Sequence, residues 1–303
     1  MKININTLVK QSTAFNNFLR DFKMDNLSQC YMVIGEDKYF RDELIQSILQ
    51  VLFCKNGPTP CGQCIECQKI LNNNNLDIMY FGTEDKFTKD DASKLREECF
   101  IKPMIGDRKI LVVSNADRMD DIPQNKLLKT LEELPPSVMV LLSVSSEMSL
   151  LPTIRSRSRK LFAYYDDAVL KDILKEHPLG DKITLCSNGQ IKEAERLAKD
   201  KNFENYYKFA VSLMQDFPNS RVLGDKGRFF VENKKDITSI LQILLYVMYD
   251  DMLHTKSDYP RQALPACIRA VARGLDALKN YANANAVIDN ILLTILEERS
   301  KCK

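Results

Sequence analysis

The feature that most constrains the fold is the alternation of apolar runs with helix-periodic segments in the first half of the chain. Continuous apolar runs of this kind are typical of strands in a parallel sheet that is covered on both faces. Between them, apolar residues recur at helical spacing, as at Leu44, Ile45 and Ile48. The alternation predicts a parallel α/β domain of nucleotide-binding type over residues 1–165. Its expected strands are residues 31–34, 76–81, 109–113 and 138–144.

From about residue 166 onward the sequence predicts helices alone. Short helical segments run through 166–202, and longer amphipathic segments follow at 236–253, 263–281 and 285–299. We therefore expect an α/β domain followed by an all-α region, divided into a small helical domain at 166–202 and a C-terminal helical domain at 203–303. The last segment carries an apolar stripe that is either the core of its own bundle or an exposed assembly face: Ile288, Ile291, Leu292, Ile295 and Leu296.

Composition and charge exclude several classes of protein. Lys and Arg exceed Asp and Glu by only two, so any nucleic-acid contact has to be local rather than spread over a basic domain. The longest apolar-rich stretch, 237–253, is interrupted by Gln242 and two aspartates and falls short of the roughly 20 residues of a bilayer span. The N-terminus lacks the features of a signal peptide. We expect a cytoplasmic protein with no membrane contact.

Four of the nine cysteines cluster between residues 54 and 67. An odd number of cysteines in a long chain of this type argues against a disulfide scaffold and for free thiols with one dedicated site. The C-x6-C-x2-C-x2-C spacing, with Gly and Pro in the turns, favours a closed structural zinc site over an iron–sulfur cluster or a redox pair. Its expected ligands are Cys54, Cys61, Cys64 and Cys67.

A glycine follows the first expected strand, in the frame of a phosphate-binding P-loop. The residues that would act on a nucleotide are replaced, because Phe40 stands for the second glycine, Arg41 for the lysine and Asp42 for the hydroxyl residue. A bulky ring obstructs the loop that must approach phosphate, and a carboxylate beside an anion is unfavourable. The degenerate loop from Gly35 to Asp42 therefore predicts that this chain does not bind ATP.

The strand at 109–113 lacks a second feature of P-loop ATPases, the carboxylate that binds magnesium. In P-loop ATPases the corresponding strand ends in a carboxylate for magnesium. Here it ends in Ser114 and Asn115, and Asp117 falls later, where we interpret it as a capping or turn residue.

Three arginines at alternating positions, Arg155, Arg157 and Arg159, follow the strand at 138–144. One interpretation is a solvated basic turn. The other is an arginine finger, in which one guanidinium reaches the γ-phosphate of a nucleotide held by a neighbouring subunit.

Taken together, these segments resemble the delta-prime subunits of the bacterial DNA polymerase III clamp loader, which belong to the AAA+ group. The resemblance covers about residues 25–165 and rests on the cysteine module together with NADRM (115–119), LLKTLEELPP (127–136) and LLPTIRSRS (150–158).

The resemblance implies a stator that does not hydrolyse ATP. Ser156 and Arg157 match the family's Ser-Arg-Cys motif, with Ser158 at the third position, so Arg157 would be the finger. It further implies a lid domain at 166–202, a C-terminal collar and structural Zn²⁺. The implied partners are the gamma/tau and delta subunits, a sliding clamp and primer-template DNA, within the DNA polymerase III holoenzyme. Two rival hypotheses are a divergent, active gamma/tau-like ATPase and a zinc-stabilised DNA-binding scaffold.

Overall fold

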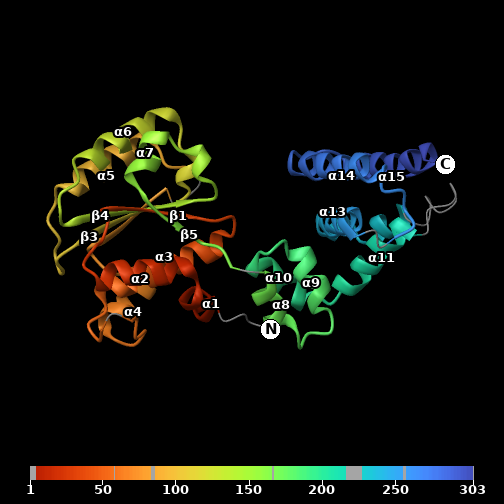
Figure 1. The fold of residues 1–303 in the computed structure, drawn as a ribbon. Coiled ribbons are helices and arrows are strands. Elements are labelled where there is room, and N and C mark those ends of the chain that lie inside the picture. Colours follow the sequence, from red (N-terminus) through yellow and green to blue (C-terminus); the bar gives the residue numbers. More distant parts are fainter. Residues whose placement is uncertain are drawn as a thin grey trace. The chain divides into compact units, whose positions relative to one another are not determined.

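The computed structural model describes residues 5–57, 59–82, 86–165, 167–215, 227–254 and 257–302. The chain forms two compact units, one of Ile3–Asp166 and the other of Asp167–Lys303 with Met1–Lys2. Figure 1 shows the helices and strands of both units.

The first unit is built on a parallel sheet of five strands in the order β2-β3-β4-β1-β5. The predicted parallel sheet is confirmed, and β1, β3 and β4 are buried along their whole length. The strands are β1 Cys30–Ile34, β2 Ile78–Phe81, β3 Lys109–Val113, β4 Val138–Val144 and β5 Arg159–Phe162.

Strand β5 lies outside the sequence prediction. It is an edge strand of four residues in which only Leu161 is buried, so it carries no continuous apolar run. Its place is fixed by pairing with β1, where Arg159 lies opposite Tyr31 and Phe162 opposite Ile34.

Helices cover both faces of this sheet. Helices α5, α6 and α7 lie over one face, and α2 and α3 lie over the other (Figure 1). The core under α5 and α6 joins alternate strand residues, such as Met32 and Leu111, to Leu95 and Leu127. The helical elements are α1 Ile5–Gln11, α2 Thr13–Lys23, α3 Lys38–Phe53, α4 Ile65–Leu71, α5 Lys89–Cys99, η1 Ala116–Arg118, α6 Asp121–Glu132, η2 Glu147–Ser149 and α7 Pro152–Arg157.

The loop between α5 and β3 is held by one buried carboxylate. Asp77 is 1% exposed and accepts hydrogen bonds from the backbone N–H groups of Met104 (2.5 Å), Ile105 (2.9 Å) and Gly106 (2.7 Å). A carboxylate with three backbone donors replaces the hydration that it loses on burial. Asp77 thereby fixes the entry of the chain into β3.

As predicted, the second unit contains helices and no strands in its described residues, 167–215, 227–254 and 257–302. Residues 227–232 are also helical. Its elements are α8 Asp167–Leu174, α9 Gly180–Ser187, α10 Ile191–Lys199, α11 Phe203–Gln215, η3 Lys234–Asp236, α13 Ile237–His254, α14 Leu264–Lys279 and α15 Ala284–Lys301. The division of this unit into a lid and a collar at residue 202 stays a prediction.

The apolar stripe of α15 packs inside its own bundle. Ile288, Ile291, Leu292 and Ile295 are all buried. Helix α14 approaches closely at Gly274, where an added Cβ would lie 2.7 Å from the Cδ1 of Ile291. This arrangement favours the first of the two interpretations of the stripe over an exposed assembly face. Among the described residues, no helix is long and apolar enough to cross a bilayer.

Candidate functional site

The loop after β1 leads within three residues into α3, and an acidic side chain caps the first turn of that helix. Asp37 is the N-cap of α3, and its Oδ1 accepts hydrogen bonds from the backbone N–H groups of Tyr39 (2.9 Å) and Phe40 (3.2 Å). The hydroxyl of Tyr165 donates to its Oδ2 at 2.9 Å. Two N–H groups at the start of α3, of the kind that bind anions at helix N-termini, are thus bonded within the chain. Sequence reasoning missed Asp37, although an aspartate directly before a helix is a recognisable N-cap signal.

Arg41 closes the same loop from inside the domain. The side chain is 3% exposed, and its Nη1 donates a hydrogen bond to the carbonyl oxygen of Gly35. Its Nε donates to Oγ of Ser143 in β4 at 3.1 Å. Burial lowers the pKa of Arg41, and the nearby carboxylates of Asp117, Asp42 and Asp37 oppose that shift. A guanidinium bonded in this way is a structural tie and is not available to span two phosphates.

The other two replaced positions have different roles. Phe40 is fully buried and packs against Tyr165, with ring centroids 4.9 Å apart. Asp42 forms an exposed ion pair with Lys38 at 2.8 Å. The carboxylate that accepts from the first amides of α3 is that of Asp37, the N-cap, whereas Asp42 lies within the helix.

Gly35 is required by the sheet. The N–H of Gly35 donates to Val144 at 3.1 Å, and the N–H of Ala163 donates to Ile34 at 2.6 Å. An added Cβ on Gly35 would collide with the carbonyl oxygen of Ala163. The glycine of the P-loop frame thus has a packing role in this chain that does not depend on phosphate.

The end of β3 carries no carboxylate at the position where an ATPase holds magnesium. Asn115 adopts a left-handed conformation with φ of 49°, and its Nδ2 donates to the carbonyl of Gly82 at 3.3 Å. Asp117 lies in η1 and accepts a hydrogen bond from the hydroxyl of Ser145. Asp117 therefore links η1 to the end of β4, which agrees with its interpretation as a turn residue.

Arg157 lies at the opposite edge of the sheet from this loop. It is the last residue of α7, and β5 then starts beside the amino end of β1. The five residues of β1 separate that edge from Gly35 by about 15 Å, at about 3.3 Å per residue. Arg157 is 41% exposed and pairs with Glu132 at 2.7 Å. Both residues line a pocket of about 460 Å³ together with Ser28, Gln29, Cys30, Leu131 and Leu134.

The side chains next to Arg157 in the sequence contact other residues of the chain. Arg159 pairs with the buried Asp21 at 2.7 Å, and Nη1 of Arg155 contacts Sδ of Met148 at 3.1 Å. The hydroxyl of Ser156 donates to the carbonyl of Thr153 at 3.0 Å and so belongs to the helix turn. Of the predicted finger residues, Arg157 is the one whose charged group lies at the surface beside a pocket.

The four predicted ligand cysteines come together. Their Sγ atoms all lie within 4.8 Å of one another. The N–H of Cys64 donates to the sulfur of Cys61 at 3.3 Å, and the N–H of Cys67 donates to the sulfur of Cys64 at 3.5 Å. The backbone N–H groups of Gln63 and Cys64 lower the pKa of Cys61 to about 6, which favours its thiolate. A cluster of four cysteines with backbone support could bind a metal ion.

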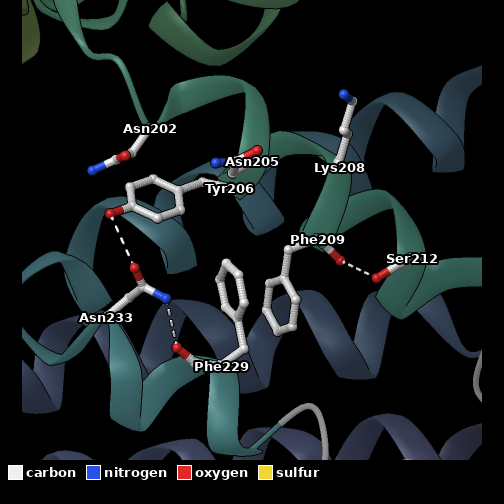
Figure 2. Close-up of a pocket in the computed structure, with 8 residues that line it drawn as sticks. All are labelled: Asn202, Asn205, Tyr206, Lys208, Phe209, Ser212, Phe229 and Asn233. Atoms are coloured by element: carbon white, nitrogen blue, oxygen red, sulfur yellow. Dashed lines mark hydrogen bonds between the residues drawn. The ribbon is translucent and has the colours of Figure 1, made fainter.

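Among the cavities of the second unit, one lies at α11 and another lies between α8, α9 and α13. The cavity at α11, of about 490 Å³, is lined by Asn233, which donates to the carbonyl of Phe229 at 2.8 Å, and by Phe209, which stacks on Phe229 at 3.9 Å (Figure 2). The hydroxyl of Tyr206 donates to Asp236 at 2.9 Å. The other cavity, of about 1030 Å³, lies between α8, α9 and α13 and is lined by Lys182, Tyr207 and His254 among others. Neither cavity contains a residue that the sequence singled out.

Comparison with solved structures identifies the fold. The chain matches the crystal structure of a DNA polymerase III gamma subunit-related protein from Thermotoga maritima with a TM-score of 0.54 and 18% identity, over 94% of this chain and 99% of that one. This chain thus shares the fold of that protein, a parallel sheet followed by helical regions.

Comparison of sequences identifies the family. Residues 10–163, about half of the chain, match the family described as "DNA polymerase III, delta subunit". The chain belongs to this family. It is 27% identical over 185 residues to DNA polymerase III subunit delta' of Bacillus subtilis, covering 59% of this chain and 56% of that protein. It is 29% identical over 147 residues to subunit tau/gamma of Haemophilus influenzae, covering 48% of this chain and 21% of that protein. The matches thus span between about a fifth and about half of these relatives.

Proposed function

We propose that this chain is a delta-prime-type stator subunit of a DNA polymerase III clamp loader, which neither binds nor hydrolyses ATP. It acts in the cytoplasm with gamma/tau and delta subunits and helps to place a sliding clamp on primer-template DNA. One observation carries the proposal: the phosphate-binding loop is occupied by the chain's own side chains. Asp37 accepts hydrogen bonds from two of the N-terminal amides of α3, and Arg41 ties Gly35 to β4.

Arg157 supports the second part of the proposal, an arginine finger given in trans. A guanidinium about 15 Å from its own loop cannot serve that loop, but it can reach a nucleotide held against the amino edge of the sheet by another subunit. Ser156 contributes the hydrogen bond that completes the turn before the finger.

We assign the four cysteines to structural zinc. A tetrahedral site with Zn–S distances of about 2.3 Å requires sulfur atoms about 3.8 Å apart. Separations within 4.8 Å need only a small contraction to reach that geometry. All four ligand positions are filled by protein, so the ion would stabilise residues 54–67 and would leave no position for a substrate.

The test is a reconstituted loader that contains the full chain, the motor subunits, the clamp and primed DNA. Loss of an arginine finger lowers turnover at the affected site by about 10³-fold or more. We expect Arg157→Ala to remove that site's share of the DNA-stimulated ATP turnover. Arg96→Ala is the matched control. Arg96 forms a similarly exposed ion pair at 2.9 Å with Glu133, which follows the partner of Arg157 in the sequence. Unchanged turnover with Arg157→Ala would refute the finger.

The similarity to tau/gamma subunits favours one competing function, a divergent active ATPase. The isolated chain distinguishes the two. A stator shows no Mg-ATP binding by equilibrium dialysis at millimolar nucleotide, whereas an ATPase shows stoichiometric occupancy.

A further inference from the structure

The guanidinium of Arg157 is held by two elements of the fold. Its Nη2 pairs with Oε1 of Glu132, the last residue of α6, at 2.7 Å. Its Nη1 donates to the carbonyl oxygen of Thr153, one turn earlier in α7, at 3.3 Å. Arginine has five N–H donors, so these two contacts set the plane of the group and leave other N–H groups for an acceptor outside the chain.

The position of Glu132 relative to α7 is fixed by a buried glutamine. Gln124 of α6 is 4% exposed, and its Nε2 donates to the carbonyl oxygens of Met119 (3.2 Å) and Ser149 (3.1 Å). Its Oε1 accepts from the N–H of Leu151, the N-cap of α7, at 2.8 Å. Leu127 and Leu131 anchor the same helix in the core. The two helices that carry Glu132 and Arg157 are therefore tied together near their amino-terminal ends.

The ion pair is too exposed to serve mainly as a source of stability. Glu132 and Arg157 are 44% and 41% exposed, and exposed pairs of this kind add little to the free energy of unfolding. A charge-assisted hydrogen bond with a fixed acceptor does, however, restrict the orientation of a long side chain. Orientation is what a group that stabilises a transition state requires.

We infer that Glu132 is a positioning residue for Arg157, which keeps the guanidinium oriented toward the γ-phosphate of a nucleoside triphosphate bound by the adjacent subunit. The inference rests on the proposed function and extends it to a residue outside the Ser156–Arg157 motif. Because the acceptor oxygen does the work, a side chain of the same shape with an acceptor should retain most of the effect.

The test measures ATP turnover of the reconstituted loader against ATP concentration for five variants of the full chain. One part of kcat depends on Arg157 and is lost in Arg157→Ala. In Glu132→Ala this part of kcat should fall roughly tenfold with KM unchanged, because the arginine is present but its orientation is no longer fixed. Glu132→Gln should stay within about threefold of wild type. Glu133→Ala is the matched control at the next position, paired with Arg96, and should leave turnover unchanged.

The double variant Glu132→Ala with Arg157→Ala should be no slower than Arg157→Ala alone, which would show that Glu132 acts through the arginine. Mass photometry of each loader separates loss of assembly from loss of orientation. Turnover by Glu132→Ala at or above the wild-type level, or equal losses for Glu132→Ala and Glu132→Gln, would overturn the inference. If Arg157→Ala itself has no effect, the proposed finger fails, and the inference fails with it.

Discussion

The side chain of Arg41 donates a hydrogen bond back to the carbonyl oxygen of Gly35, six residues earlier in the chain. The hydrogen bond joins the start of the loop after β1 to the first turns of α3 through a buried guanidinium. In a working P-loop, backbone amides and a lysine point toward the nucleotide. Here the basic residue is buried and its Nε donates a hydrogen bond to Ser143 of β4.

The Arg41 tie predicts that stability depends on this basic residue. Arg41→Met removes hydrogen bonds from a charged donor to Gly35 and Ser143, and we expect the free energy of unfolding to fall by about 3 kcal/mol. Urea denaturation followed by circular dichroism measures the change. Lys38→Met, which removes an exposed ion pair on the same helix, should cost no more than about 0.5 kcal/mol. A similar small loss for both variants would contradict the tie.

Gly35 offers a test of why the glycine is present. Gly35→Ala places a methyl group against the carbonyl oxygen of Ala163, and we expect about 1–3 kcal/mol of destabilisation from the forced separation of β1 and the chain after β5. Gly227→Ala is the comparison, because an added Cβ there meets nothing within 4 Å. It should be neutral or slightly stabilising. The melting temperatures of both variants are measured by calorimetry. A lower value for Gly35→Ala supports a packing role of the glycine, whereas an unchanged value would leave only a role in phosphate binding.

The carboxylate of Asp77 should be among the more sensitive single sites of the first unit. Asp77→Ala leaves three backbone N–H groups of the loop at 104–106 without their acceptor, and we expect a loss of about 2–4 kcal/mol. Asp107→Ala, in the same loop but exposed, should change stability by less than about 0.5 kcal/mol. Hydrogen exchange of residues 104–106 would show directly whether the loop opens.

The cysteine cluster predicts a metal content of about one zinc per chain, measured by mass spectrometry of the purified protein. Cys64→Ser should abolish zinc binding while keeping the cap of α4, because the Cys64 side chain accepts from the N–H of Cys67 and serine is a good N-cap residue. Cys302→Ser, at an exposed position far along the sequence, should retain the metal. Zinc-free wild-type protein with an intact module would refute the assignment.

The sequence predicted the parts of the fold that depend on local pattern. Continuous apolar runs predicted β1, β3 and β4, whose residues are buried. The sequence also predicted that the four cysteines lie together, because all four occur within one segment of fourteen residues.

What the sequence did not predict depends on contacts between distant residues. Strand β5 has one buried residue and is defined by its pairing with β1. The ion pair of Arg157 with Glu132 joins residues on separate helices, and the acceptor role of Asp77 spans more than 25 residues. Asp37 differs from these cases, because an aspartate directly before a helix is a local N-cap signal. The comparison with the P-loop pattern considered the carboxylate of Asp42 and not that of Asp37.

The separation of Gly35 and Arg157 on opposite edges of one sheet gives the subunit a direction. On the proposed function, this chain would donate a group to one neighbour in a head-to-tail ring and would receive none from the other. It would then end a series of working sites, so a ring that contains it once would have a defined first and last motor subunit. The two edges of the sheet would in this way set the order of the neighbouring subunits.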